Sequence, residues 1–224
     1  MCVLICRVGD RPLIGANRDE FYNRPFSGPR RWEGDVAFTA PLDETEGGTW
    51  IGRNDAGMVA AITNLSRLDT KEGRASRGHL VAGALSQPDV ESARAFLDHE
   101  LAQAERNPCQ ILLLQAGRAV VCVNEGDRYF FEELAPGTHV LSNLHDTDEV
   151  VFDLPADFTL DDLRPILADT RKNLPRDFAV CKYTGNRGTV SSSLIDPVSG
   201  EYWYAGGAPD QTPYERQPLP PQPS

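Results

Sequence analysis

The chain has 224 residues, of which 40% are hydrophobic, 25% charged and 8% aromatic, a balance typical of a folded domain rather than a disordered chain. Such a length allows one domain or at most two small ones. Lys and Arg number 22 against 33 Asp and Glu, so the formal charge is −11. That charge argues against nucleic acid and anionic membrane surfaces as partners.

No stretch approaches the roughly 20 apolar residues that span a bilayer. The opening MCVLICRVGD carries neither a basic leader nor a small-residue cleavage site. We therefore expect no stable membrane insertion and a cytoplasmic location. The 5 cysteines form no CxxC pair and lie near no histidine at metal-ligand spacing, which predicts reduced thiols and no metal site.

Short strands separated by turns are predicted for the first third of the chain. The short turn at residues 54–57 is typical of an antiparallel hairpin. The predicted strands cover residues 3–8, 13–17, 36–40, 49–53 and 58–64.

The middle of the chain changes to a helical period. Apolar positions three and four apart predict a helix that begins near Ser76, followed by a second helix for which Asp89 is the N-cap. Strands are expected again over residues 109–115 and 119–124. The continuous apolar run in the first of these indicates burial on both faces.

A third helix is indicated by Thr159 and Asp162, which resemble a capping box with Asp in place of Glu. A final hairpin is expected over residues 189–195 and 201–204. The Pro-rich segment from Pro209 onward is expected not to pair in a sheet and to be disordered.

The order of these elements predicts an α+β fold in which helices pack on antiparallel sheets, rather than an alternating βαβ fold. No linker or internal repeat interrupts residues 1–207. We therefore predict a single domain over residues 1–207 and a disordered tail over residues 208–224.

Cys2 is the first candidate for chemistry because it directly follows the initiator Met. Removal of Met1 would leave a terminal cysteine, whose amine (pKa about 8) can accept the proton of its own thiol (pKa about 8.5) near neutral pH. The residue would then supply both nucleophile and base. The alternative is that the second residue of the chain has no functional role.

A cluster of four polar residues, Asn17-Arg18-Asp19-Glu20, ends the second predicted strand. If the first two strands form a hairpin, Arg18 lies near Cys2, where a guanidinium favours the thiolate. Asp19 would then be able to hydrogen-bond the terminal amine. A solvated turn is the alternative interpretation.

Three further polar residues lie at strand ends. Asn64 and Asn143 carry side-chain amides suited to a developing oxyanion, with a role in turns as the alternative. Arg187 is suited to clamp a carboxylate or phosphate group, or to form a surface salt bridge. No histidine pair has metal-binding spacing and no GxSxG motif is present, which disfavours metal and serine hydrolysis.

Several motifs in one order resemble the NRDE family, which is the transport and Golgi organisation protein 2 family. The resemblance extends from Cys2 to about Ile195. The motifs are Met1-Cys2, Asn17-Arg18-Asp19-Glu20, the block GGTWIGRNDAGMVAAITN from Gly47 to Asn64, Leu141-Ser142-Asn143 and the segment Asn186 to Ser192.

This resemblance implies a layout similar to the N-terminal-nucleophile (Ntn) hydrolases, in particular the cysteine branch that contains choloylglycine and penicillin V acylases. The implied fold is a four-layer αββα sandwich. The resemblance also implies roles by position: Cys2 as nucleophile, Arg18 as thiolate partner, Asp19 as amine partner, Asn64 and Asn143 as oxyanion or substrate donors, and Arg187 as clamp.

Two functions follow as expectations. One is an amidohydrolase or thioesterase that acts on a small acyl compound and requires no cofactor. The other, implied by the resemblance, is a non-catalytic protein that binds and traffics haem, or alternatively acyl-CoA or a lipid, in the same cleft. The sequence holds no CxxCH motif that would mark a haem ligand.

Overall fold

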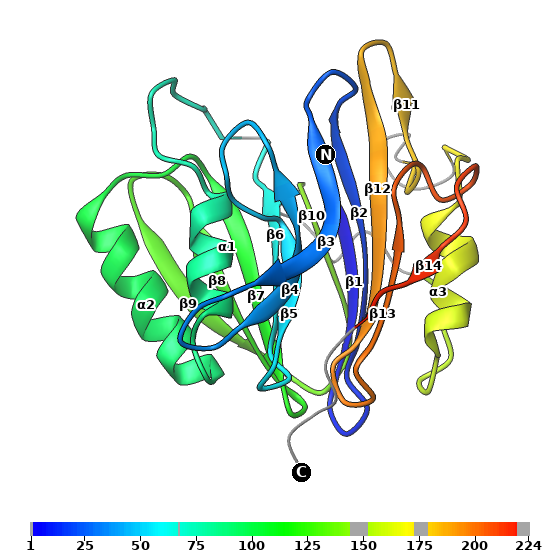
Figure 1. Cartoon of the computed structure of the whole chain (residues 1–224), viewed down its shortest axis with the longest axis horizontal. Helices are drawn as coiled ribbons and strands as arrows, with labels where there is room; N and C mark the ends of the chain where they lie inside the picture. The colour runs from blue at the N-terminus through cyan, green and yellow to red at the C-terminus, as the bar shows by residue number, and fades with distance from the viewer. Residues whose placement is uncertain (1, 67, 144–151, 173–178, 219–224) are drawn as a thin grey trace.

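The computed structural model describes residues 2–66, 68–143, 152–172 and 179–218. Within them, two antiparallel sheets lie face to face. Helices α1 (Gly78–Leu85) and α2 (Val90–Gln103) cover one outer face, and α3 (Leu160–Leu167) covers the other (Figure 1). The predicted α+β class and the four-layer αββα sandwich are confirmed.

In the first sheet, the N-terminal strand lies between the edge strand and the second strand of the chain. In order, the strands of this sheet are β10 (Gly137–Ser142), β1 (Val3–Val8), β2 (Leu13–Phe21), β12 (Arg187–Asp196), β13 (Glu201–Ala205) and β14 (Glu215–Arg216), with β11 (Tyr183–Thr184) paired to β12. The predicted hairpin of the first two strands is present, since β1 and β2 are antiparallel neighbours.

The second sheet follows the chain order, and each strand pairs with the next. Helices α1 and α2 are inserted between its fourth and fifth strands and pack on its outer face. The strands are β3 (Phe26–Trp32), β4 (Phe38–Asp43), β5 (Ile51–Asn54), β6 (Val59–Asn64), β7 (Cys109–Gln115), β8 (Arg118–Asn124) and β9 (Tyr129–Leu134).

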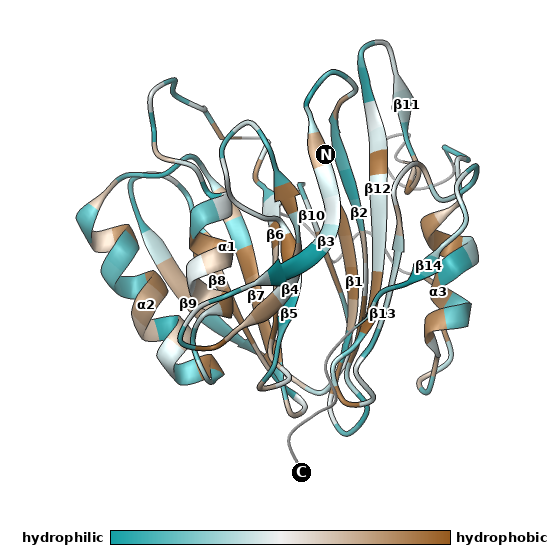
Figure 2. Cartoon of the chain, viewed as in Figure 1, coloured by the Kyte–Doolittle hydropathy of each residue, from teal (hydrophilic) through white to brown (hydrophobic). Residues whose placement is uncertain are grey.

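Apolar side chains of β1 alternate between two cores. Leu4 and Cys6 are buried between the sheets, whereas Val3 and Ile5 are buried against α3. Figure 2 shows the matching apolar character of the central strands. By the same alternation, Cys2 belongs to the face of the sheet that looks toward the second sheet.

Both predicted helix caps are confirmed. The Asp89 side chain accepts a hydrogen bond from the backbone N–H of Ser92 at 2.8 Å. Thr159 and Asp162 form a capping box at the start of α3. These caps satisfy backbone donors that a helix cannot pair internally, which explains why the sequence marks both positions.

Five strands lie outside the sequence predictions: the two-residue strands β11 and β14, and the longer strands β3, β9 and β10. Each of the three longer ones is an edge strand, with β3 and β9 at the two ends of the second sheet and β10 at one end of the first. Edge strands lie partly in solvent, so they lack the apolar pattern of a central strand. The segments FSGPRRW and YFFEEL are accordingly largely half-buried or exposed.

The expectation that the chain after Pro209 does not pair in a sheet is wrong. Glu215–Arg216 pair with β13, in the register Trp203↔Arg216 and Tyr204↔Glu215. An edge position requires hydrogen bonds on one side only, which a two-residue stretch between prolines can supply. Residues 219–224 of the predicted tail lie outside the described part of the chain.

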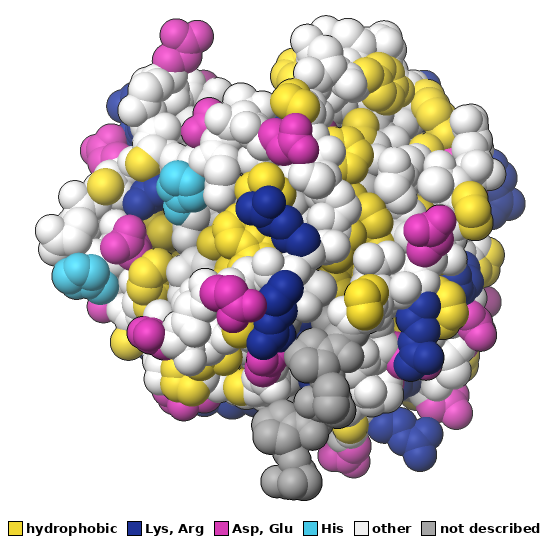
Figure 3. Space-filling model, viewed as in Figure 1, with side chains coloured by type: hydrophobic (Ala, Val, Ile, Leu, Met, Phe, Trp, Pro, Cys, Tyr) yellow, Lys and Arg dark blue, Asp and Glu magenta, His cyan; other side chains and the backbone are white. Residues whose placement is uncertain are grey.

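None of the helices in the described residues has the length and apolar composition needed to cross a membrane. On the face shown in Figure 3, basic and acidic side chains are interspersed. This visible face therefore lacks a broad surface of one charge.

Candidate active site

The pairing of β1 places Cys2 between two of the predicted residues. Val3 pairs with Asn17 on β2 and with Ser142 on β10. One step toward the N-terminus in each antiparallel pair, Cys2 is flanked by Arg18 on one side and Asn143 on the other. The strand pairing thus brings Arg18 and Asn143, which are far apart in sequence, to the two sides of Cys2.

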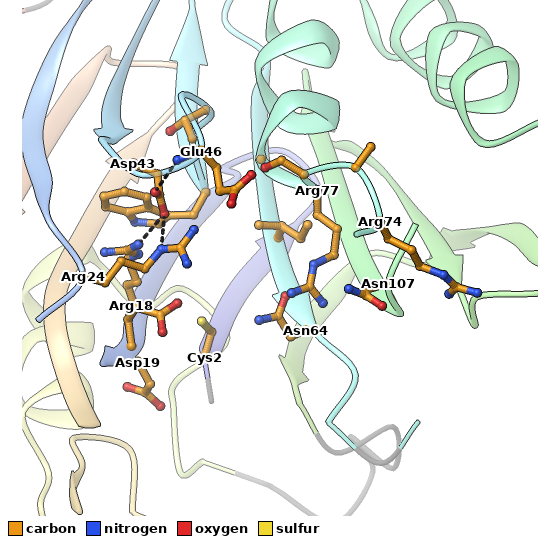
Figure 4. A pocket seen from close by; sticks show the side chains of 17 residues that line it. Cys2, Arg18, Asp19, Arg24, Asp43, Glu46, Asn64, Arg74, Arg77 and Asn107 are labelled. Atoms are coloured by element: carbon orange, nitrogen blue, oxygen red, sulfur yellow. Dashed lines mark hydrogen bonds and ion pairs between the residues drawn. The ribbon is translucent and has the colours of Figure 1, made fainter. Parts of the chain in front are cut away.

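Cys2 lines a pocket of about 220 Å³ to which both sheets contribute (Figure 4). Its side chain is partly exposed, whereas the other four cysteines are buried. Burial raises the pKa of the Cys6 thiol to about 12 and that of Cys109 to about 11. Among the five cysteines, Cys2 is therefore the one that a ligand in the pocket can reach.

Arg18 is a buried cation beside this thiol, with an exposed fraction of 5%. Its Nη2 donates to Asp43 Oδ2 at 2.8 Å, and its guanidinium lies 4.0 Å from the centre of the Trp50 ring. Burial lowers the pKa of Arg18, while the charges of Asp43 and Cys2 oppose that shift. Its Nη1 is buried and has no hydrogen-bond partner among the described residues.

Asp43 holds two arginines with one carboxylate oxygen, since Arg18 and Arg24 both lie 2.8 Å from Oδ2. Backbone N–H groups of Thr45 and Glu46 donate to its Oδ1 at 3.1 and 3.2 Å. Burial tends to raise the pKa of Asp43, but the two arginines outweigh it and hold the pKa below the usual 3.8. Asp43 therefore remains ionised and anchors Arg18.

Asn143 contacts the backbone of Cys2. Its Oδ1 accepts a hydrogen bond from the Cys2 backbone nitrogen, and its Nδ2 donates to Ser66 Oγ at 2.8 Å. Since a backbone N–H can only donate, the side chain must present its oxygen to Cys2. Asn143 thus lies directly beside Cys2, and its role as an oxyanion or substrate donor stays a prediction.

Asn64 projects into the pocket from the end of β6 and lies between Cys2 and Arg77 in Figure 4. Within the described residues, no hydrogen bond holds its side-chain amide. It therefore retains the free N–H groups that an oxyanion donor needs.

Asp19 lines the same pocket. Its carboxylate accepts hydrogen bonds from Thr189 Oγ1 at 2.7 Å and from Lys182 Nζ at 3.0 Å. Side chains alternate along β2, so Asp19 points to the face of the sheet opposite Arg18. There its carboxylate contacts Thr189 of β12. Asp19 lies in the site, and its role as amine partner stays a prediction.

Arg187 does not line this pocket. It is exposed at the start of β12, with its guanidinium 4.6 Å from the centre of the Phe21 ring. The β2–β12 register pairs it with Phe21, three residues beyond Arg18 along β2, so the strand carries Arg187 away from Cys2. The structure thus separates Arg187 from the other predicted site residues.

Other lining residues carried no local signal in the sequence. They come from the end of β4 and the turn after it, from the segment that leads into α1 and from the connection between α2 and β7, and only the packing of distant segments brings them to Cys2. They include Asp43, Glu46, Arg74, Arg77 and Asn107.

Metal ligation finds no support in the described part of the chain, where no group of three or more His, Cys, Asp or Glu could hold an ion. His79, His99 and His139 are absent from the pocket lining. His145 lies outside the described residues.

Comparisons with known proteins agree with this geometry. The family model of Transport and Golgi organisation 2 matches residues 1–151. The Transport and Golgi organization protein 2 homolog of Bos taurus is 33% identical over 159 residues, which are 64% of this chain and 57% of the relative. The Homo sapiens homolog is 30% identical over 159 residues, with the same coverage. The chain thus spans 57% of the length of these relatives.

Solved structures with low sequence identity share the fold. Penicillin V acylase from Agrobacterium tumefaciens has a TM-score of 0.54 and 13% identity, and the match covers 92% of this chain and 83% of the acylase chain. The R18L variant of conjugated bile acid hydrolase from Clostridium perfringens has a TM-score of 0.56 and 14% identity, covering 100% and 98%. The Caenorhabditis elegans ortholog of N-acylethanolamine-hydrolyzing acid amidase has a TM-score of 0.57 and 11% identity, covering 88% and 93%.

The sandwich is therefore that of the Ntn hydrolases. The match to the family model covers more than half of the chain and includes the strands that carry Cys2 and Arg18. The chain belongs to the Transport and Golgi organisation 2 family.

Proposed function

We propose that the chain, once Met1 is removed, is a cysteine hydrolase that cleaves an amide or thioester bond of a small acyl compound. The observation that carries this proposal is the pair formed by Cys2 and Arg18. The thiol lines an open pocket, and the buried guanidinium beside it has an Nη1 without a partner in the described residues. Such a cation stabilises a thiolate.

The proposed reaction begins with transfer of the Cys2 thiol proton to its own terminal amine. The thiolate then attacks the acyl carbonyl, and the N–H groups of Asn64 stabilise the oxyanion. Asn143 Oδ1 holds the amine in place. The protonated amine gives its proton to the departing amine or thiol, leaving an acyl thioester on Cys2. Water then releases the carboxylic acid and restores the thiol.

The structural relatives support the reaction class. Their names describe an acylase, a bile acid hydrolase and an acid amidase. The names of two solved bile acid hydrolase structures carry the substitutions C2A and R18L, a cysteine and an arginine with the same numbers as the pair in this chain.

The first experiment is intact mass spectrometry of the purified chain together with a turnover assay on acyl amides and thioesters. The proposal expects loss of Met1, a burst of product and an acylated Cys2. Turnover should vanish in Cys2→Ala. It should persist in the control Cys6→Ala, which removes a buried thiol from the same strand. Activity of a chain that retains Met1 would contradict the amine as base.

Haem binding is the alternative function that the resemblance implies. The cavity of about 220 Å³ is smaller than the roughly 300–1,000 Å³ of typical ligand pockets. Among its described lining residues, Cys2 is the only thiol or imidazole. The pocket therefore fits a small acyl compound better than a macrocycle. A saturable Soret shift on haem titration, lost in Cys2→Ala, would reverse this order of preference.

A further inference from the structure

Four arginines line the pocket, and they differ in their partners. Arg18 and Arg24 share Asp43, and Arg74 pairs with Glu105 at 2.6 Å. Arg77 has no carboxylate partner within the described residues. Its Nη1 donates to the backbone carbonyl of Pro108 at 2.9 Å. Arg77 is therefore the one arginine in the described pocket lining that forms no ion pair with a protein carboxylate.

The position of Arg77 relates it to the proposed chemistry. In Figure 4, its guanidinium lies next to the amides of Asn64 and Asn107, and Asn64 separates it from Cys2. A substrate whose carbonyl lies between Cys2 and Asn64 would extend toward this guanidinium. Asn107 is also held in place, since its side chain exchanges two hydrogen bonds with the backbone of Lys71.

Helix α1 favours an anion at the same point. Arg77 is its N-cap residue, no side chain caps the helix, and its first turn contains no acidic residue. Unpaired backbone N–H groups at a helix start carry partial positive charge. Arg77 and the start of α1 therefore both attract a negatively charged ligand.

Close main-chain packing holds the start of α1 in place. The backbone N–H of Thr49 donates to the carbonyl of Gly78 at 3.2 Å. A Cβ on Gly48 would lie 2.4 Å from the carbonyl carbon of Gly78, so the two backbones touch at a distance that only glycine allows. Arg77 is thus fixed to the β4–β5 turn, which also carries the wall of the pocket around Asp43.

We propose that Arg77 is a specificity-determining residue that binds a carboxylate of the acyl substrate. The inference rests on the proposed hydrolase function and deepens it by naming the substrate class. A guanidinium can bind a carboxylate through two parallel hydrogen bonds, which is stronger and more selective than a single neutral contact. The carboxylate belongs either to the leaving group, as in an N-acyl amino acid, or to the acyl part, as in a monoamide of a dicarboxylic acid.

The test compares each acid with its methyl ester, which keeps the shape and removes the charge. N-butanoylglycine and its ester represent the first source, and glutaramic acid and its ester represent the second. Calorimetry on Cys2→Ala measures binding without turnover, and kcat/KM is measured on the chain with Cys2 intact. We expect at least one acid to be preferred over its ester by about 10- to 100-fold, the range for a hydrogen bond to a charged group.

Arg77→Gln should reduce that preference to about one. The matched control is Arg31→Gln, which removes a guanidinium from the surface of β3, where it pairs with Asp55. The control should leave the preference intact. Equal binding of acid and ester by the parent chain would overturn the inference without any variant. Persistence of the preference in Arg77→Gln would also overturn it.

The binding and turnover data separate the two proposals. A preference for the acid that depends on Arg77, without product release, would retain the carboxylate site and refute the hydrolase. Turnover with equal rates for acid and ester would retain the hydrolase and refute the carboxylate site.

Discussion

The two walls of the pocket are built by different means. On the β1–β2 wall, Cys2 and Arg18 are cross-strand neighbours whose separation is set by the ladder of hydrogen bonds. On the opposite wall, Asp43 ends strand β4 and Arg77 lies at the start of helix α1, and they reach the pocket through packing between the two sheets. The difference suggests that the first wall supplies the reacting atoms and that the second holds and selects.

Asp43 links the two walls, so its removal should have the largest effect. Asp43→Asn leaves the buried charge of Arg18 without its counter-ion, and we expect a loss of about 3–5 kcal/mol in the free energy of unfolding. Urea denaturation measures this loss. The control Asp55→Asn removes the partner of Arg31 in a more exposed pair. It should cost no more than about 1 kcal/mol. An equal loss of unfolding free energy in the two variants would contradict the role of Asp43 as the anchor of Arg18.

Asn64 tests whether the second wall also takes part in the reaction. Asn64→Ala should lower kcat by about 10²- to 10³-fold, the usual effect of removing an oxyanion donor. The unfolding midpoint should change little, because the side-chain amide is held by no hydrogen bond in the described residues. Asn186→Ala, outside the pocket lining, serves as control and should keep kcat. A loss confined to KM would assign Asn64 to ground-state binding.

The free energy of unfolding at acid pH should depend on the ionisation of Asp43. Its pKa in the folded chain lies below the usual 3.8, because Arg24 and Arg18 outweigh the opposing effect of burial. A depressed pKa contributes stability above about pH 4 that is lost as the pH falls through the folded value. The free energy of unfolding of Asp43→Asn should therefore fall less steeply below pH 4. Parallel curves for parent and variant would mean that Asp43 has the same pKa in both states.

The smallest effect is expected for Arg187, which the structure places outside the pocket. Arg187→Ala should leave kcat and KM within experimental error, because the guanidinium lies over Phe21 rather than toward Cys2. Steady-state kinetics on the best acyl substrate would check this. A tenfold rise in KM would show that the substrate extends beyond the pocket and would restore the predicted clamp.

The β1–β2 wall could be predicted from the sequence because its geometry is local. Once Val3–Val8 and Leu13–Phe21 form a hairpin, pairing and alternation place Arg18 beside Cys2. Helix caps such as Asp89 were predictable for the same reason, since each cap depends on residues three positions apart. Resemblance to a known family added the four layers and the order of the sheets.

The second wall could not be predicted in this way. Asp43 lies beyond the strand predicted over residues 36–40 and Arg77 at the start of a predicted helix, but their closeness to Cys2 arises from contacts between the two sheets and α1. Edge strands such as β10 were missed because solvent replaces one neighbour and relaxes the apolar pattern. The true orientation of Asn143 also depends on a distant partner, Ser66.

The contact between Gly48 and Gly78 fixes the position of one side of the pocket. Because backbone touches backbone there, the start of α1 cannot move closer to the β4–β5 turn, so the main chain at Arg77 is fixed against this wall of the pocket. A fixed main chain at Arg77 limits how far its guanidinium can reach toward the scissile carbonyl of a bound substrate. Homologous ligands that differ by one methylene should then be ranked by length as well as by charge.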